Sequence, residues 1–224
     1  LPASVVSEAA TTSTVKPHAN LPMGVPMTSD PFFNCYTKFE FKIIKKLGSG
    51  YWGDVSLVEH EATRTQYAVK QFKNEHQNFV NNHIKEIRFI KKLKHQRIIT
   101  FYGLILDDLP WIIMELMEEN SASFINKFAN DKDQRIKKAK QIVSDTAHGL
   151  MYLHYKKIIH RDLHTGNILV DKNGRAKIGD VGNAIDAGIC RETACAPWFV
   201  PPEWDKKRTF SNASDLYQLG ICIL

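Results

Sequence analysis

The stretch that most restricts the fold of this chain is IIHRDLHTGNILVDKNGRAKIGDVG, residues 158–182. Two short apolar runs, at 168–170 and 176–178, flank the turn sequence DKNG and predict a β-hairpin. The loops on either side of this hairpin carry two carboxylates and one amide, those of Asp162, Asn167 and Asp180. Carboxylate and amide oxygens are suitable ligands for Mg²⁺. The same residue types are also common in turns, so this stretch alone leaves both interpretations open.

The first half of the chain is rich in predicted strands. Apolar, β-rich runs bounded by turn residues occupy 39–47, 54–60, 65–72, 98–106 and 110–117. A single helix is expected over 81–95, where Ile84, Ile87 and Leu93 recur near helical spacing. This half therefore predicts a sheet accompanied by one helix.

The second half is predominantly helical. Residues 135–157 carry apolar side chains at spacings of three and four, which predicts an amphipathic helix. We expect its buried face to consist of Ile136, Ala139, Val143, Ala147, Leu150 and Leu153. A β-rich part followed by a helical part indicates an α+β fold.

Residues 1–37 differ from the rest of the chain. They are rich in Ala, Ser, Thr, Pro and Met, they carry few charges, and they show no helical or strand periodicity. Such a segment can bury little apolar surface, so we expect a flexible leader.

The composition narrows the class of protein. The chain has 224 residues, of which 43% are hydrophobic and 24% charged, a globular balance. Its net charge of +6 is spread along the chain, which does not indicate a nucleic-acid partner. No apolar run approaches the ~20 residues that cross a bilayer. The four cysteines show neither metal-ligand spacing nor a dense disulfide framework. We expect a soluble, cytoplasmic protein with no membrane segment; the composition predicts no oligomeric state.

Three glycines, Gly48, Gly50 and Gly53, form a G-x-G-x-x-G pattern. This pattern opens a dinucleotide-binding unit when a helix follows it. Here the predicted strand 54–60 follows, which favours a hairpin whose backbone N–H groups can bind phosphates. A simple glycine-rich turn is the other interpretation.

Lys70, at the end of YAVK, and Glu86, on the expected helix, form a candidate pair. A lysine that contacts phosphate oxygens must be held in position, and a carboxylate on a helix can do this. Alone, the two would be read as ordinary surface charges. Together with the glycine pattern, they favour a phosphate site.

The order of these motifs carries a resemblance to a known family. The glycine pattern, YAVK, the helix glutamate, HRDLHTGN, DVG and PPE follow one another between about residue 39 and the end. This order resembles the eukaryotic protein kinase family. HRDLHTGN and DDLPWIIMELMEENSASF look more like tyrosine-kinase-like Ser/Thr kinases than true tyrosine kinases.

The resemblance implies a two-lobed α+β kinase fold. The β-rich N-lobe would span 38–116 and the mainly helical C-lobe 117–224. The chain would end within the central C-lobe helix, leaving that lobe incomplete.

The resemblance also implies ATP and Mg²⁺ as the bound groups. Gly48, Gly50 and Gly53 would cover the phosphates, and Lys70, paired with Glu86, would contact them. Val55 and Ala68 would pack above the adenine and Leu169 below it, with Met114 as gatekeeper and Glu115 and Met117 in the hinge. The catalytic base would be Asp162. Asn167 and Asp180 would bind Mg²⁺, and Asp215 would brace the catalytic loop.

The sequence departs from the family pattern at several positions. Val181 replaces the phenylalanine that follows the metal-binding aspartate, and His164 replaces a lysine expected near the γ-phosphate. Ala196 stands where Ser/Thr kinases generally keep a threonine that contacts the base. Thr193 is the sole candidate phosphorylation site of the activation segment, with Arg161 as its partner; a standing charge on Glu192 is the alternative.

These observations predict ATP-dependent phosphoryl transfer to Ser or Thr hydroxyls of a protein substrate. The alternative is a pseudokinase that binds nucleotide or acts as a scaffold without transferring phosphate. A kinase of small metabolites would share the ATP site, but the PPE segment, which resembles a protein-substrate platform, argues against it.

Overall fold

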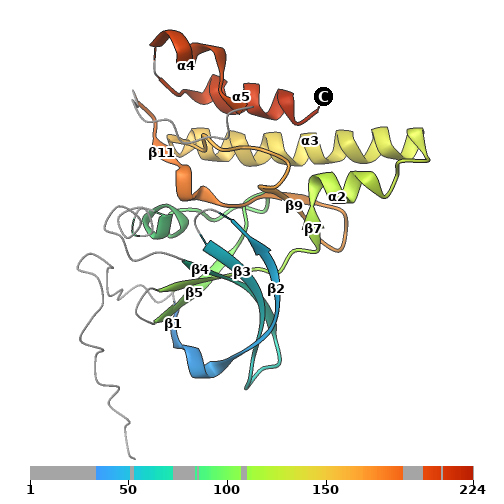
Figure 1. Cartoon of the computed structure of the whole chain (residues 1–224). Helices are drawn as coiled ribbons and strands as arrows, with labels where there is room; N and C mark the ends of the chain where they lie inside the picture. Colours follow the sequence, from blue (N-terminus) through green and yellow to red (C-terminus); the bar gives the residue numbers. More distant parts are fainter. Residues whose placement is uncertain are drawn as a thin grey trace, which may run out of the picture.

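The computed structural model describes residues 34–50, 53–72, 84, 86–106, 110–188, 199–207 and 209–223. Figure 1 shows two parts: a strongly curved sheet, and a group of helices stacked on one side of it. The expected boundary between the two lobes, after residue 116, falls in the connection between β6 and β7.

The first part is a six-stranded sheet. Its strands are β1 (Asn34–Thr37), β2 (Phe41–Ser49), β3 (Gly53–His60), β4 (Gln66–Phe72), β5 (Phe101–Leu106) and β6 (Trp111–Met114). The spatial order is β1-β5-β6-β4-β3-β2, and every neighbouring pair is antiparallel except β1 and β5. Residues 84 and 86–90 are helical, as predicted, but the helix ends at Ile90 rather than at residue 95; residues 81–83 and 85 lie outside the described residues.

Two expectations about the start of the sheet are wrong. The leader was expected to extend to residue 37, but Asn34–Thr37 forms β1 and pairs in parallel with β5. The strand expected from residue 39 begins at Phe41, because Lys38–Glu40 forms a 3₁₀ turn. That turn is capped by Glu40, whose carboxylate accepts the Thr37 backbone N–H at 2.7 Å. The pairing of β1 depends on a partner 69 residues away (Asn34 opposite Gly103), which local composition cannot indicate.

The two faces of the sheet pack against different cores. One face buries a cluster of Phe41, Val58, Val69, Ile105 and Ile113. Successive residues of a strand point to opposite faces. Accordingly, Leu104 and Ile112 face the other way and join a larger core with Ile87 and Ile90. This larger core continues into the helical part and so connects the two halves of the chain.

Among its described residues, the second part contains the helices α2 (Ser121–Asn126), α3 (Lys132–Tyr155), α4 (Pro202–Lys207) and α5 (Asn212–Ile221). Its short strands are β7 (Glu119–Asn120), β8 (Ile158–Ile159), β9 (Ile168–Val170), β10 (Ala176–Ile178) and β11 (Ile185–Asp186). β9 and β10 form the predicted hairpin with the predicted bounds, and β7 pairs with the other edge of β9. The sequence of the hairpin alone was sufficient for this prediction.

The buried face of α3 differs from the expected one. The helix buries Ile142, Asp145, Thr146, Gly149, Leu150 and Leu153. Only Leu150 and Leu153 were predicted; Ile136 is 43% exposed and Ala147 is also exposed. The cause is that α3 packs through small and polar groups. A Cβ atom at position 149 would lie 2.8 Å from the Arg97 carbonyl oxygen, so a glycine permits this close approach.

Asp145 connects α3 to two distant segments. Its carboxylate accepts hydrogen bonds from the Arg175 guanidinium at 2.8 and 2.9 Å and from the Ala176 backbone N–H at 3.0 Å. Arg97 Nε lies 3.3 Å from the same carboxylate. Burial alone would raise the pKa of Asp145, but the bonds from Arg175 and Ala176 and the charge of Arg97 outweigh it and lower the pKa.

We expect Asp145→Asn to lower the free energy of unfolding by about 3 kcal/mol, because it leaves the buried Arg97 without a counter-charge and removes the ion pair with the partly exposed Arg175. A carboxyl with a lowered folded-state pKa stabilises the fold above its ordinary pKa of about 4 and loses this effect as the pH falls. The deficit of the variant should therefore shrink below about pH 4. Denaturant unfolding of both proteins at several pH values measures this; a deficit that does not depend on pH would contradict it.

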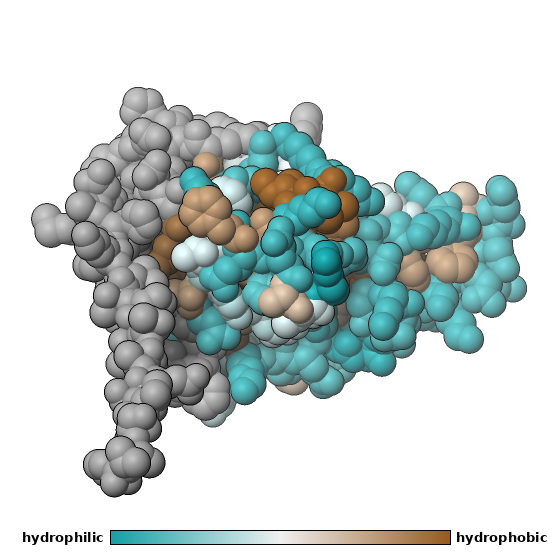
Figure 2. Space-filling model, turned by 90° about the horizontal axis from the view of Figure 1, so that it is seen from below, coloured by the Kyte–Doolittle hydropathy of each residue, from teal (hydrophilic) through white to brown (hydrophobic). Residues whose placement is uncertain are grey.

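The surface of the sheet side is mainly hydrophilic. Figure 2 views the molecule from that side and shows hydrophobic patches separated by hydrophilic residues. Exposed apolar side chains of this part include Phe39, Ile43, Ile44, Leu47 and Tyr102. Among the described residues, no helix has both the length and the apolar character needed to span a membrane. Cys35 and Cys222 are free, and Cys190 and Cys195 lie outside the described residues.

Candidate active site

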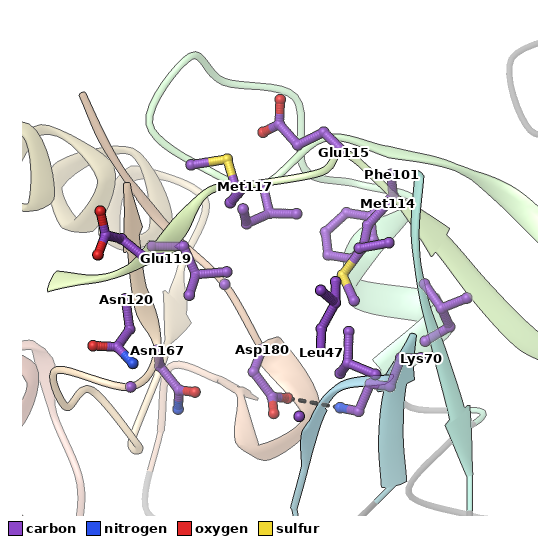
Figure 3. Close-up of a pocket in the computed structure, with 18 of the residues that line it drawn as sticks. Leu47, Lys70, Phe101, Met114, Glu115, Met117, Glu119, Asn120, Asn167 and Asp180 are labelled. Carbon is purple, nitrogen blue, oxygen red and sulfur yellow. Dashed lines mark hydrogen bonds and ion pairs between the residues drawn. The ribbon is translucent and has the colours of Figure 1, made fainter. Parts of the chain in front are cut away.

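A cavity of about 470 Å³ lies between the six-stranded sheet and the β9–β10 hairpin. Figure 3 shows its lining side chains converging from both halves of the chain. The predicted site residues that line it are Gly48, Val55, Ala68, Lys70, Glu86, Met114, Glu115, Met117, Asn167, Leu169 and Asp180. Gly50, Gly53 and Asp162 are not among its lining residues.

Several lining residues were not predicted. Leu47 precedes the glycine pattern and Ile112 lies two positions before Met114, so their motifs could have suggested both. Phe101, Glu119 and Asn120 also line the cavity, and all three are labelled in Figure 3. No motif points to these three, because the pairing of β5 with β6 and of β7 with β9 places them there.

The glycine pattern lies in a hairpin, as expected. β2 and β3 pair antiparallel with Gly48 opposite Val55, and the Gly50 backbone N–H donates to the Gly53 carbonyl at 2.8 Å. A strand follows the pattern, which excludes the dinucleotide-binding arrangement. A Cβ atom at position 53 would lie 2.3 Å from the Gln71 carbonyl oxygen, so only glycine fits at this point of the β3–β4 pair.

Lys70 is held between two carboxylates. Its Nζ lies 2.9 and 3.1 Å from the two oxygens of Glu86 and 2.9 Å from Asp180 Oδ1. The Lys70 and Glu86 side chains are 8% and 4% exposed, whereas that of Asp180 is 38% exposed and faces the cavity. The ammonium group is thus anchored on the buried side by Glu86, while Asp180 lies on the open side.

The charges of this trio depend on one another. Burial would lower the pKa of Lys70, but Asp180 and Glu86 outweigh it and raise the pKa, so Lys70 is a cation at neutral pH. Burial raises the pKa of Glu86 to about 7, although Lys70 opposes this. Burial also tends to raise the pKa of Asp180, but Lys70 and the Gly182 N–H hold it below its usual value. Asp180 is therefore ionised at neutral pH.

Asp180 begins a tight turn. Its backbone has φ 46°, in the left-handed region that non-glycine residues seldom adopt, and a 3₁₀ turn, η2 (Val181–Asn183), follows. The Gly182 backbone N–H donates to Asp180 Oδ1 at 3.2 Å. Val181, which departs from the family pattern, is fully buried in the larger core. The turn is thus anchored by an apolar side chain even though valine is smaller than phenylalanine.

Asn167 connects the cavity to Asp162. Its Nδ2 donates to the Asp162 carbonyl at 2.8 Å, which leaves its amide oxygen as an acceptor, and Figure 3 shows the side chain facing the cavity together with Asp180. One amide oxygen and one ionised carboxylate are hard oxygen ligands, so the pair fits Mg²⁺. The described residues contain no group of three or more His, Cys, Asp or Glu side chains that could hold a metal alone. Phosphate oxygens of a nucleotide would have to complete the coordination.

The carboxylate of Asp162 contacts the side chain of Asn183 and lies near that of His164. Asn183 Nδ2 donates to its Oδ2 at 2.9 Å, and His164 Nε2 lies 4.0 Å from the same oxygen. His164 Nδ1 accepts the Gly166 backbone N–H at 3.1 Å, which leaves Nε2 to carry the proton of the neutral ring. His164 therefore presents an N–H group near Asp162, where the family pattern has an ammonium.

Asp215 holds the backbone before Asp162. It is fully buried on α5 and accepts the backbone N–H groups of His160 and Arg161, both at 2.9 Å. It also accepts His154 Nε2 at 2.8 Å. Arg161 has φ 68°, so the carboxylate stabilises an uncommon backbone conformation immediately before the predicted base. This is the bracing expected of Asp215.

An ion pair connects the hinge to the hairpin. Lys177 Nζ lies 2.6 and 2.7 Å from the two carboxylate oxygens of Glu115. Glu115 also accepts the Thr100 backbone N–H at 2.9 Å. The carboxylate of Glu115 is thus bound to Lys177 and to the Thr100 backbone, and does not point toward the place where the family resemblance puts the adenine.

The predicted phosphorylation site lies beyond what the structure describes. Thr193, Glu192 and Ala196 are outside the described residues. Arg161, the expected partner of a phosphorylated Thr193, is buried, and its Nε donates to the Asn183 carbonyl at 2.7 Å.

The cavity with its lysine, carboxylates and glycine hairpin has the arrangement expected of a phosphoryl-transfer enzyme, and comparison with known proteins supports this class. The family model of the protein kinase domain matches residues 41–224. The serine/threonine-protein kinase pakH of Dictyostelium discoideum is 32% identical over 185 residues, which cover 81% of this chain and 36% of that protein. The probable serine/threonine-protein kinase mkcC, also of Dictyostelium discoideum, is 28% identical over 187 residues, which cover 82% of this chain and 21% of that protein.

The chain belongs to the protein kinase domain family. The predicted resemblance to eukaryotic protein kinases and the two-lobed α+β fold are thereby confirmed. The chain spans about a third or less of the length of these two curated relatives. The narrower tyrosine-kinase-like assignment stays a prediction.

Proposed function

We propose that this chain carries the catalytic site of a protein kinase that transfers the γ-phosphate of ATP to Ser and Thr hydroxyls. The observation that carries the proposal is the Lys70–Glu86–Asp180 trio at the edge of the cavity, with Asn167 linking that cavity to Asp162. A cation, an ionised carboxylate and a general base in this arrangement suit phosphoryl transfer.

The nucleotide would enter between the sheet and the hairpin. Val55, Ala68 and Leu169 offer apolar surface for the adenine, and Gly48 of the β2–β3 hairpin lines the cavity where this hairpin would cover the phosphates. Lys70, fixed by Glu86, would bind phosphate oxygens as a positioned cation. Mg²⁺, when held by Asn167 and Asp180, would neutralise phosphate charge.

Asp162 would act on the hydroxyl acceptor. Its carboxylate can orient the hydroxyl and accept its proton as the oxygen attacks the γ-phosphorus, while the bond from that phosphorus to the β-phosphate oxygen breaks and ADP leaves. Most of the rate of such reactions comes from positioning and charge stabilisation rather than from covalent chemistry. Two contacts that restrain Asp162 support this role. Asn183 binds its carboxylate directly, and Asp215 holds the backbone of the preceding residue, Arg161.

The proposed class of phosphate acceptor, Ser and Thr hydroxyls, is supported by the similarity to the two curated relatives. Both relatives are named serine/threonine-protein kinases, and HRDLHTGN looks like the tyrosine-kinase-like branch of Ser/Thr kinases. We therefore propose Ser and Thr hydroxyls of proteins as acceptors, and a cytoplasmic location where ATP and Mg²⁺ are abundant.

The test is transfer from γ-labelled ATP with Mg²⁺ to a general protein acceptor, followed by acid hydrolysis of the product. Labelled phosphoserine and phosphothreonine are expected. Phosphotyrosine alone would overturn the acceptor class. ATP binding without transfer, in a chain extended to the length of its relatives, would favour the pseudokinase.

A further inference from the structure

Asn183, the last residue of η2, contacts the catalytic loop through both its side chain and its backbone. Its Nδ2 donates to Asp162 Oδ2 at 2.9 Å, and its carbonyl oxygen accepts Arg161 Nε at 2.7 Å. Because Arg161 and Asp162 are neighbours in the chain, these two hydrogen bonds close a ring between the catalytic loop and η2. No sequence motif pointed to Asn183.

We propose that Asn183 is a positioning residue that fixes the orientation of the Asp162 carboxylate. The inference rests on the proposed kinase function and adds a determinant of its rate. A carboxylate on a single Cβ–Cγ bond can rotate, and a general base is effective only when the acceptor oxygen lies within hydrogen-bond reach. Holding Oδ2 restricts this rotation.

The amide is well suited to this task. It donates a hydrogen bond without carrying a charge, so it orients the carboxylate without neutralising it. A lysine or arginine at position 183 would stabilise the carboxylate anion strongly and make it a weaker base. An aspartate would repel it. The residue type therefore favours an orienting role over a simple ion pair.

The position of Asn183 depends on the same turn that presents Asp180. η2 is closed by the Ala184 N–H, which donates to the Val181 carbonyl at 3.0 Å, and it is anchored by the buried Val181 side chain. On the far side, the Arg161 guanidinium lies over the Phe210 ring, 5.6 Å from its centre. A change in the turn would therefore move the proposed metal ligand and release the base together.

This contact bears on a departure from the family pattern. The resemblance implies a threonine contact to the base from position 196, where this chain has Ala196. The Asn183 amide provides a donor to Asp162 from a different segment. Asn183 would thus supply a restraint that the alanine cannot.

Steady-state kinetics on the variants Asn183→Ala, Asn183→Asp and Asn183→Gln tests the proposal. We expect kcat to fall about tenfold to a hundredfold in Asn183→Ala, with KM for ATP changed less than about twofold. Asn183→Asp, which keeps the size but adds a like charge, should be slower still, and Asn183→Gln should recover part of the rate. Asn173→Ala, an exposed asparagine of the hairpin turn, is the matched control and should keep the full rate.

A merely structural asparagine predicts a different order. The aspartate variant, equal in shape, would then match or exceed the alanine variant, and such an order would overturn the proposal. A loss confined to KM for ATP would overturn it as well.

A second measurement does not depend on activity. Thermal unfolding of Asp162→Ala, Asn183→Ala and the double variant should give non-additive shifts in Tm, because the two residues interact. Additive shifts would contradict the contact itself. If the wild-type chain transfers no phosphate, the proposed kinase function is wrong, whatever the Tm values show. Non-additive Tm shifts in a chain that transfers no phosphate would mean that Asn183 is only a structural contact, and would overturn its positioning role.

Discussion

Lys70→Met should lower kcat/KM for phosphoryl transfer about a hundredfold to a thousandfold. The methionine keeps much of the volume of the lysine but removes the cation that Glu86 and Asp180 hold in the cavity. Phosphate oxygens would then lose their positioned partner on the sheet side. Transfer of label under saturating ATP measures this loss.

The same substitution should also destabilise the fold in a pH-dependent way. Burial raises the pKa of Glu86 to about 7, so above that pH the wild-type carboxylate relies on Lys70 for compensation. A carboxyl with a raised folded-state pKa favours folding at low pH and opposes it as the pH rises. The deficit of Lys70→Met should therefore grow by about 1.4 kcal/mol between pH 6 and pH 8.

The double variant Lys70→Met/Glu86→Gln separates the two effects. Replacing Glu86 removes the buried charge, so most of the stability should return at pH 8 while kcat/KM stays as low as in Lys70→Met. A double variant as unstable as the single one would contradict the assignment of the deficit to Glu86. Transfer within about tenfold of wild type would contradict the role of Lys70.

Asp215→Asn should lower both stability and turnover. Asp215 is fully buried and accepts three N–H groups, from His154, His160 and Arg161. An asparagine offers one oxygen and one NH₂ group, so at least one donor would face another donor. We expect a loss of about 3 kcal/mol in the free energy of unfolding.

The loss of turnover follows from the backbone of Arg161. Without the carboxylate, its left-handed conformation can relax and displace Asp162. We expect kcat to fall about a hundredfold, in line with a misplaced catalytic group. Asp133→Asn, an exposed residue in the first turn of α3, is the matched control and should change both quantities little. An Asp215→Asn variant with wild-type kcat would show that the catalytic loop does not need this brace.

The sequence alone predicted those parts of the fold and of the site that depend on local patterns and on the order of motifs. The bounds of β9 and β10 followed from two apolar runs around a turn, and the lining positions Lys70, Asn167 and Asp180 followed from motif order. The position of Glu86 near Lys70, 16 residues away in the chain, also followed from that order.

The sequence alone did not predict the features that depend on contacts between distant segments of the chain. β1 is defined by its pairing with β5, and the buried face of α3 is set by Asp145 and Gly149, which an apolar pattern cannot reveal. Asn183 carries no motif signal, since its role depends on a 3₁₀ turn that carries it to Asp162. Contacts between segments distant in the chain have no local periodicity to read.

The most direct test of the central claim compares wild type with Asp162→Asn for two quantities, the rate of label transfer from ATP and the dissociation constant of Mg²⁺–ATP. Asp162 does not line the cavity, so nucleotide affinity should stay within about twofold while transfer falls about a hundredfold or more. Equal transfer by both proteins would contradict the claim that Asp162 is the base of this site.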